Sequence, residues 1–286
     1  MRIRARRVTS STAAFGFALL ALLTLTTRAE AQSRPAFFDQ PSELREIGEA
    51  AGPDEHMPVV VFLAPTGGTS PWIFERIHEA VPFAHYLAVL PPGQPERSDY
   101  LPHFNDFVSW MEQRVMTDLA QARSTFVIDD ERIYLAGFSL GGDTSWALLA
   151  RDPEIFRGAV VMGSRSSARL RTGKLAAMRA HHVRVAFAIG AQDDANRVSG
   201  IRRSHQVMVD GHIPTRLDIY PGEHVPPPDP EMLAALFRFV MSDTSAASPA
   251  ATPQVEPAAE ARPTPHRRRT HRARRLHRRR RPRRAP

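Results

Sequence analysis

The chain of 286 residues contains no cysteine, which excludes disulfide bonds, thiolate metal sites and anchoring through a lipid-modified cysteine. It also lacks any metal-ligand spacing, phosphate-binding loop or dinucleotide fingerprint, so we expect a protein that works without a metal or cofactor. No internal repeat is present. What the chain does contain is an uneven distribution of charge.

Acidic residues are scarce at both ends of the chain and plentiful between them. Residues 1–31 carry five arginines and one glutamate, and residues 244–286 carry 13 arginines and two glutamates. Since the whole chain has a net charge of +8, residues 32–243 have a net charge of −7. The strong basicity therefore belongs to the two ends, and we do not expect a specific nucleic-acid-binding domain.

The first 31 residues have the pattern of a secretory signal peptide. Four arginines within the first seven residues precede an apolar run over 13–25, and Ala29-Glu30-Ala31 follows as a cleavage site. We expect cleavage after Ala31 and export to the periplasm or the extracellular space. An uncleaved N-terminal anchor is the alternative, although the apolar run is short for a membrane span.

The last 43 residues, 244–286, have a composition that cannot bury a core. They are rich in alanine, proline, serine and threonine, then almost purely arginine and histidine, with Val255 and Leu276 as the large apolar residues. We expect this tail to be disordered. Its arginines would attract anionic envelope polymers or lipids, and the alternative is a solvated tail without a specific partner.

Residues 32–243 are enough for one domain with a sizeable core. Short apolar runs rich in β-branched residues alternate with segments of helical spacing, which predicts an α/β fold: a single three-layer α/β/α domain with a mostly parallel sheet. No long insertion follows the strand that ends at 162, so we expect an open site. Strands are expected at 57–64, 85–90, 133–136, 158–162, 183–189 and 215–220, and helices at 71–81, 103–123, 143–150, 168–180, 197–209 and 230–241.

The pentapeptide Gly137-Phe138-Ser139-Leu140-Gly141 lies between a predicted strand and a predicted helix. In that context G-x-S-x-G is typical of a nucleophile elbow, a sharp turn that lifts the serine hydroxyl out of the sheet. Gly137 and Gly141 would leave room for the neighbouring strand and helix. The pentapeptide alone arises by chance in roughly one chain in ten of this length, so its partners must decide.

Two titratable residues follow later predicted strands, in the chain order serine, acid, histidine. Asp193 comes after the strand at 183–189 and His224 after the strand at 215–220. Ligand chemistry in open α/β sheets lies beyond the carboxyl ends of the strands, where these loops converge on Ser139. Asp194 is the alternative to Asp193, and His224 could instead be a loop histidine without a catalytic role.

Residues 58–224 resemble the α/β-hydrolase superfamily, and within it the branch of carboxylesterases, phospholipases and dienelactone-hydrolase-like proteins. The matching segments lie at 129–142, 152–161, 190–193 and 220–224. The resemblance implies that His224 is the general base for Ser139 and that Asp193 orients the imidazole. It also implies an oxyanion hole that combines the Leu140 N–H with an N–H from the loop after the first strand.

That loop departs from the pattern of the family, because Pro65 stands where most relatives have histidine. The oxyanion hole needs backbone N–H groups alone, so Thr66 or Gly67 can still donate. Trp72 and Phe138 are candidates for lining an acyl pocket, although aromatic residues beside a sheet more often belong to the core.

The sequence thus predicts a serine esterase that acts on small ester substrates. Short or medium acyl chains are favoured over long-chain lipids, because no large apolar lid is visible. An acyltransferase or peptidase on the same triad is an alternative. A non-catalytic envelope-binding protein on a hydrolase fold, with the arginine-rich tail as its functional part, is another.

Overall fold

The computed structural model describes residues 34–50, 52 and 55–242. The chain divides into two units, Met1–Ser242 and Asp243–Pro286. The predicted signal segment 1–31 and the predicted tail 244–286 lie outside the described residues. The described part of the first unit contains the whole predicted α/β core.

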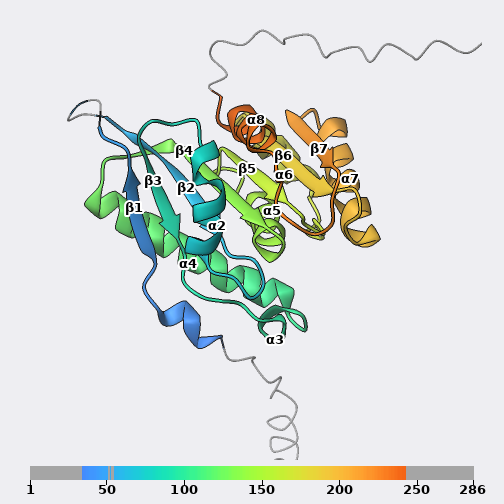
Figure 1. The fold of residues 1–286 in the computed structure, drawn as a ribbon. Coiled ribbons are helices and arrows are strands. Elements are labelled where there is room, and N and C mark those ends of the chain that lie inside the picture. The colour runs from blue at the N-terminus through green and yellow to red at the C-terminus, as the bar shows by residue number, and fades with distance from the viewer. Residues whose placement is uncertain (1–33, 51, 53–54, 243–286) are drawn as a thin grey trace, which may run out of the picture. The chain divides into compact units, whose positions relative to one another are not determined.

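Seven strands form a single sheet in the order β1-β3-β2-β4-β5-β6-β7 (Figure 1). Neighbouring strands pair in parallel, except that β1 runs antiparallel to β3. The sheet is therefore mostly parallel, as the alternation of strands and helices predicted. The strands are β1 Glu43–Ile47, β2 Met57–Leu63, β3 Tyr86–Leu90, β4 Ile128–Phe138, β5 Gly158–Met162, β6 Arg184–Gly190 and β7 Thr215–Tyr220.

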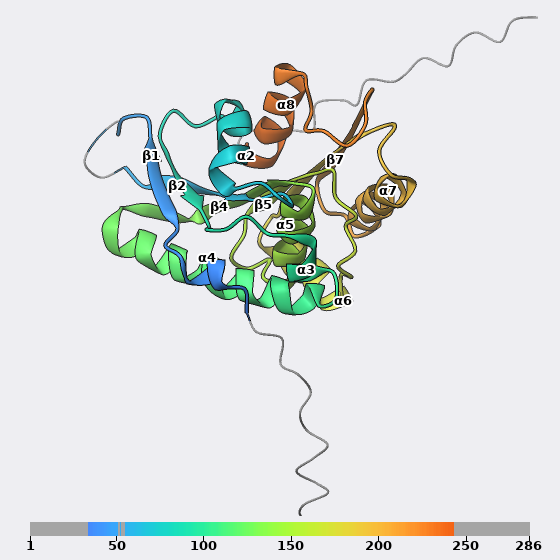
Figure 2. The same ribbon diagram turned by 60° about the horizontal axis from the view of Figure 1, so that its bottom comes forward.

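Helices cover both faces of the sheet, which gives the three layers of an α/β/α domain (Figure 2). Helices α2 and α8 pack on one face, and α4, α5, α6 and α7 pack on the other. The helices are α2 Ser70–Ile77, α3 Arg97–Tyr100, α4 Phe104–Thr125, α5 Leu140–Arg151, α6 Thr172–Ala180, α7 Ala195–Asp210 and α8 Pro230–Met241. Two 3-10 turns, η1 Ala36–Asp39 and η2 His78–Ala80, complete the described elements.

Strand β2 shows why the apolar runs predicted buried strands. All seven of its residues are buried, because successive side chains point to opposite faces and both faces are covered. Val59, Val61 and Leu63 join the core under α4 to α7. Val60 and Phe62 join the core under α2 and α8.

Apart from small shifts of element ends and the short elements η1 and α3, which were not predicted, the structure differs from the sequence prediction at three places. Strand β1 was not predicted, because its residues are only half-buried or exposed and carry charge. Strand β4 begins at Ile128, well before the predicted start at 133, because the charged stretch between hides the strand pattern. Helix α6 begins at Thr172 instead of 168, since residues 164–171 form an irregular segment after β5. This segment borders the site described next.

Among the described residues, no helix combines the length and the apolar character that a membrane crossing requires.

Candidate active site

Ser139 stands at the turn between β4 and α5, at the carboxyl edge of the sheet. Its backbone has φ 58° and ψ −117°, a conformation that a residue with a side chain rarely adopts. Two backbone hydrogen bonds hold this strained turn: Ser139 N–H donates to Met162 O at 2.9 Å, and Asp143 N–H donates to Ser139 O at 2.9 Å. The surrounding structure thus imposes the strain, as is common where a side chain must be presented for chemistry.

The two glycines of the motif are required by close approaches of backbone to backbone. A Cβ on Gly141 would lie 2.7 Å from the carbonyl carbon of Leu63 and closer still to its oxygen. A Cβ on Gly137 would lie 3.0 Å from the Cα of Gly141, and closer to its carbonyl group. Helix α5 can therefore press against β2 and β4 only with glycine at both positions.

The side chains of Ser139, His224 and Asp193 form one hydrogen-bonded row. His224 Nε2 lies 2.9 Å from Ser139 Oγ, and His224 Nδ1 lies 2.7 Å from Asp193 Oδ2. Asp193 stands three residues after the end of β6 and His224 four residues after the end of β7, on adjacent strands. A proton on Nδ1 that is donated to the carboxylate leaves Nε2 as an acceptor for the serine hydroxyl.

Asp194, the alternative to Asp193, is engaged elsewhere. Its carboxylate accepts a hydrogen bond from the backbone N–H of Asn196 at 3.0 Å and caps the N-terminus of α7. The side chain of Asp193 is instead 2 % exposed and directed at His224. The geometry therefore brings Asp193, and not its neighbour, to the imidazole.

Hydrogen bonds also hold the loop that carries His224. The Tyr220 hydroxyl donates to the backbone carbonyl of Val225, and burial raises the pKa of this phenol. The Gln192 N–H donates to Gly222 O at 2.9 Å, and the Gly222 N–H donates back to the Gln192 side chain. The loops after β6 and β7 are thus tied together, which keeps the Asp193 carboxylate next to the His224 imidazole.

The loop after β2 is held by the segment that precedes α3. Gly67 N–H donates to Pro95 O at 2.9 Å, and Gln94 Nε2 donates to Gly67 O at 2.8 Å. Thr66 Oγ1 lies 2.9 Å from the Tyr100 hydroxyl. Among the described residues the Thr66 N–H has no hydrogen-bond partner, whereas the Gly67 N–H is already used.

Leu140 is the first residue of α5, so its N–H belongs to the turn of the helix in which N–H groups have no partner within the helix. The helix dipole favours negative charge at this end. This N–H lies directly after Ser139. If the serine attacked a carbonyl group, the negative oxygen of the tetrahedral adduct would need a donor at this place.

Two charged residues that the sequence analysis did not single out support this edge of the sheet. Asp143 is buried in α5 and accepts hydrogen bonds from Ser164 Oγ at 2.7 Å and Arg165 N–H at 2.6 Å. Burial raises the pKa of Asp143, and these two hydrogen bonds oppose the increase. The segment after β5 is therefore tied to the first turn of the helix that follows Ser139.

Arg197, in the first turn of α7, is 8 % exposed and links Asp193 to the segment after β5. It donates to Gly163 O at 2.6 Å, and its Nε lies 3.9 Å from Asp193 Oδ1. Burial lowers the pKa of the guanidinium. A spacing of four residues between Asp193 and Arg197 was visible in the sequence, but it indicated at most an ordinary helical ion pair.

The two aromatic candidates contact different parts of the site. Phe138 is 5 % exposed, and its ring packs against the imidazole of His224 with centroids 4.7 Å apart. Trp72 of α2 is 36 % exposed and carries the guanidinium of Arg76 over its ring at 3.7 Å. Its indole lies beside Gly68 of the loop after β2.

The site is open toward solvent on the side of the imidazole. Ser139 is 7 % exposed as a whole, whereas the side chain of His224 is 36 % exposed. Within the described part of the chain, no group of three or more histidine, aspartate or glutamate residues could hold a metal ion. The chemistry that this arrangement can perform is nucleophilic attack by a serine that an adjacent imidazole deprotonates.

Neither a scan against family models nor a search of curated proteins finds a match for this chain. Solved structures do match. A phospholipase/carboxylesterase from Dyadobacter fermentans is 17% identical, with 69% of this chain and 96% of that chain covered and a TM-score of 0.53. A Bacillus cereus carboxylesterase is 14% identical, with 70% and 92% covered and a TM-score of 0.51.

A further Bacillus cereus protein, described as uncharacterized, is 13% identical, with 78% of this chain and 67% of that chain covered and a TM-score of 0.54. At these identities a structural likeness establishes the fold and not the activity. Together with the seven-stranded sheet and its helices on both faces, the likeness shows that this chain has the α/β-hydrolase fold.

Proposed function

We propose that the protein is a serine hydrolase that cleaves carboxylic ester bonds through an acyl-enzyme on Ser139. The observation that carries this proposal is the continuous hydrogen-bonded row from Asp193 through His224 to Ser139, with distances of 2.7 and 2.9 Å. A serine hydroxyl is a weak nucleophile by itself, and an imidazole in this position removes its proton as it attacks.

The reaction would begin when Ser139 Oγ attacks the ester carbonyl carbon while His224 Nε2 takes the hydroxyl proton. Asp193 accepts the hydrogen bond from Nδ1 and stabilises the resulting imidazolium. The tetrahedral intermediate collapses when His224 returns the proton to the departing alcohol. Water then attacks the acyl-enzyme by the same proton route and releases the carboxylic acid.

The negative oxygen of the tetrahedral intermediate needs two N–H donors. Leu140 supplies one, since its N–H follows the nucleophile at the start of α5. We assign the second to Thr66, because the Gly67 N–H already donates to Pro95 O. The hydrogen bond between Thr66 Oγ1 and the Tyr100 hydroxyl would hold this donor in place without the histidine found in most relatives.

The exposure of His224 supports hydrolysis over acyl transfer. An acyltransferase must keep water from its acyl-enzyme, whereas here the imidazole side chain is 36 % exposed. Trp72 lies beside Gly68 of the proposed oxyanion loop and Phe138 packs against the proposed base, and we propose that both limit the space for the acyl chain. Short or medium acyl chains are the expected substrates.

The test is labelling with a fluorophosphonate probe together with hydrolysis of p-nitrophenyl esters of increasing chain length. Ser139→Ala should abolish labelling and reduce kcat by about 10⁶-fold, and His224→Ala should have a comparable effect. Ser199→Ala is the matched control, because Ser199 is exposed on α7 and should label and turn over as the wild type does. Equal labelling of Ser139→Ala and wild type would contradict the proposal.

A pair of adjacent substitutions tests the assignment of the acid. Asp193→Asn should lower kcat by about 10⁴-fold, as loss of the orienting carboxylate does in the Ser-His-Asp template. Asp194→Asn should leave kcat unchanged, because that carboxylate caps α7. The opposite order of effects would transfer the role to Asp194.

A further inference from the structure

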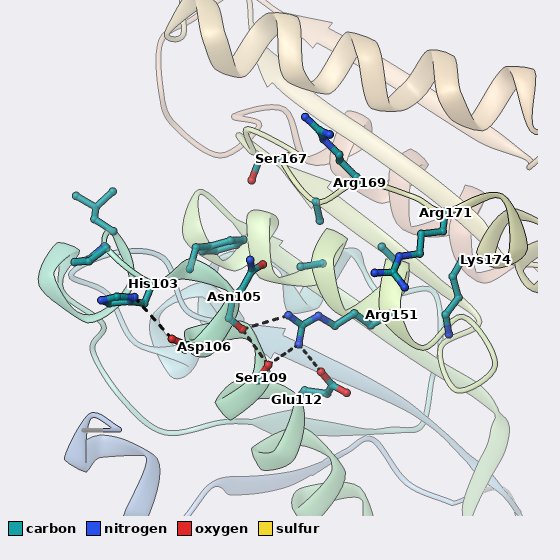
Figure 3. A pocket seen from close by; sticks show the side chains of 16 residues that line it. His103, Asn105, Asp106, Ser109, Glu112, Arg151, Ser167, Arg169, Arg171 and Lys174 are labelled. Carbon is teal, nitrogen blue, oxygen red and sulfur yellow. Dashed lines mark hydrogen bonds and ion pairs between the residues drawn. The ribbon is translucent and has the colours of Figure 1, made fainter. Parts of the chain in front are cut away.

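Two cavities lie on either side of the segment that follows β5, and neither is lined by Ser139, His224 or Asp193. The first has a volume of about 1160 Å³ and lies between the start of α4, the end of α5 and the first turn of α6 (Figure 3). The second has a volume of about 600 Å³ and is lined on one side by α7. Ser167, Ala168 and Arg169 line both cavities, so the segment forms a shared wall.

The walls of these cavities are strongly cationic. The first is lined by Arg151, Arg169, Arg171 and Lys174, with Asp106 and Glu112 as its acidic residues. In Figure 3, Arg151, Arg171 and Lys174 lie at the right of the cavity, opposite His103 and Asp106. The second cavity is lined by three arginines and no acidic residue. Since residues 32–243 have a net charge of −7, this local excess of positive charge runs against the body as a whole.

Part of this positive charge has no ion-pair partner. Arg151 pairs with Glu112 at 2.7 Å, and Lys174 pairs with Glu154 at 3.3 Å. Arg165 of the second cavity lies with its Nη1 at 3.8 Å from Asp143 Oδ2, and in the described part of the chain the remaining guanidinium groups have no such contact. Among the described residues no ion pair or hydrogen bond engages the side chains of Arg169, Arg171 and Arg203. Three exposed guanidinium groups are therefore available to a ligand without the loss of an internal contact.

The cavities lie next to the proposed active site in the chain and in space. One wall of the first begins at Leu101, directly after Tyr100, whose hydroxyl lies 2.9 Å from Thr66 Oγ1. The shared wall begins after Gly163, where an added Cβ would lie 3.2 Å from His224 Cε1. Asp143 and Arg197 hold this wall through Arg165 and Gly163. A ligand in either cavity thus contacts segments that are anchored at the carboxyl edge of the sheet, where Ser139 lies.

We propose that these two cavities bind a ligand that carries several anionic groups, with carboxylates or phosphates facing Arg169, Arg171 and Arg203. A guanidinium presents a planar fork that matches either oxyanion, which is why arginine suits such groups. The first cavity exceeds the volume that a single small anion occupies, and Arg169 extends the cationic wall into the second. An extended oligoanion can therefore neutralise arginines of both cavities at once.

This inference is independent of the esterase proposal, because binding would not require Ser139. Hydrogen exchange of the full chain is the suitable readout, since it separates the cavities from the arginine-rich segment 244–286. The probes are tripolyphosphate and trigalacturonate, which carry several phosphates or carboxylates, with maltotriose as a neutral saccharide. Protection is measured over 164–174 and 198–207 at low and high NaCl.

The perturbation is the triple variant Arg169→Gln, Arg171→Gln, Arg203→Gln. The matched control is Arg123→Gln, Arg202→Gln, Arg238→Gln, which removes the same charge from exposed positions outside both cavities. Thermal unfolding of both variants checks that the fold is intact. Calorimetry then compares their affinities for each probe.

We expect an anionic probe to protect 164–174, with affinity that falls as NaCl rises. The cavity variant should bind at least about tenfold more weakly, and the control variant should bind as the wild type does. Protection by trigalacturonate alone would identify carboxylates as the ligand groups, and protection by tripolyphosphate alone would identify phosphates. The proposal is overturned if maltotriose protects equally, if protection is confined to 244–286, or if both variants lose the same affinity.

Discussion

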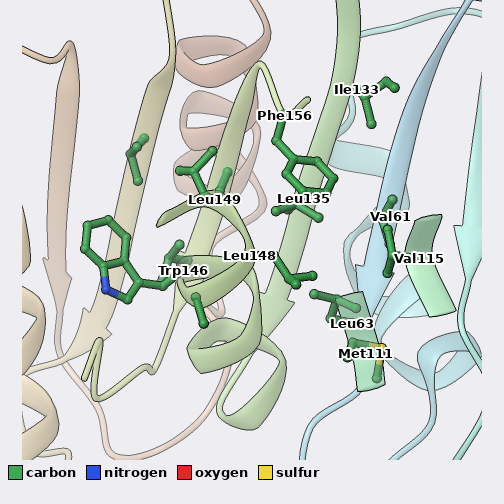
Figure 4. Packing of buried hydrophobic residues seen from close by; sticks show 14 of the residues in the cluster. Val61, Leu63, Met111, Val115, Ile133, Leu135, Trp146, Leu148, Leu149 and Phe156 are labelled. Atoms are coloured by element: carbon green, nitrogen blue, oxygen red, sulfur yellow. The ribbon is translucent and has the colours of Figure 1, made fainter. Parts of the chain in front are cut away.

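Replacement of Gly141 by alanine tests whether helix α5 must press against β2 for Ser139 to be presented. The added Cβ would lie 2.7 Å from the carbonyl carbon of Leu63, and backbone atoms of a central strand cannot rotate away. Figure 4 shows the buried cluster under this helix, to which Leu148 of α5 and Leu63 of β2 both belong. The substitution therefore pushes the helix away from the sheet along its buried face.

The size of the effect follows from the overlap. Ordinary contacts between such atoms are about 3.5 to 4 Å, so α5 must move by about 1 Å. Overpacking in a buried site costs about 1 to 3 kcal/mol, and a rigid backbone neighbour places Gly141→Ala at about 3 kcal/mol or above. A displacement of about 1 Å at a catalytic group lowers turnover by about 100-fold. We expect both losses, with the urea midpoint falling by about 1 M.

The assay combines urea unfolding at pH 7 with the rate of fluorophosphonate labelling. Gly173→Ala is the matched control, because its Cβ would meet no atom within 4 Å and the residue lies in helix α6. That change should be neutral or stabilise by about 0.5 to 1 kcal/mol. If Gly141→Ala unfolds within about 0.5 kcal/mol of the wild type and labels at the same rate, the packing requirement is refuted.

Two further predictions concern buried charge. Arg197→Met leaves the carbonyl of Gly163 without its 2.6 Å charged donor and should lower stability by about 1.5 to 3 kcal/mol in urea unfolding at pH 7; a change under about 0.5 kcal/mol would contradict this. For Asp152, burial and then the charges of Glu112 and Glu154 raise the pKa to about 6. The folded pKa exceeds the unfolded one, so wild-type stability falls as pH rises from about 4 to about 6. Asp152→Asn should be about 1 kcal/mol more stable than wild type at pH 7 and equal to it at pH 4, after allowance for screening of this half-buried group. A difference that does not depend on pH would refute the assignment.

The sequence alone was sufficient for those features that depend on short-range patterns. Continuous apolar runs predicted the central strands, because a strand with helices on both faces buries every side chain. The glycines around Ser139 predicted the turn, and the positions of Asp193 and His224 just past strand ends predicted that the three would meet. Strand β1 was missed for the opposite reason. An edge strand with charged, half-exposed residues has no apolar run to reveal it.

What the tertiary structure alone decided depends on contacts between segments far apart in the chain. The sequence left Asp193 and Asp194 as alternatives, and the choice follows from which carboxylate reaches His224 across two adjacent strands. It likewise left Thr66 and Gly67 as candidate donors, and our proposal of Thr66 rests on the hydrogen bond that Gly67 N–H already donates to Pro95 O. Such contacts depend on how the loops fold back over the sheet, which local periodicity does not encode.

The cationic cavities depend on both. Arg165, Arg169, Arg171 and Lys174 lie close together in the sequence, in a stretch over 155–192 without acidic residues, whereas Arg151 of α5 and Arg203 of α7 join them only in the folded chain. Folding brings them to one side of the molecule because parallel strands return each connecting segment to the same edge of the sheet. The order of residues thus determined the strands, the helices and the turn at Ser139, while the three-dimensional arrangement decided which charges and donors face one another.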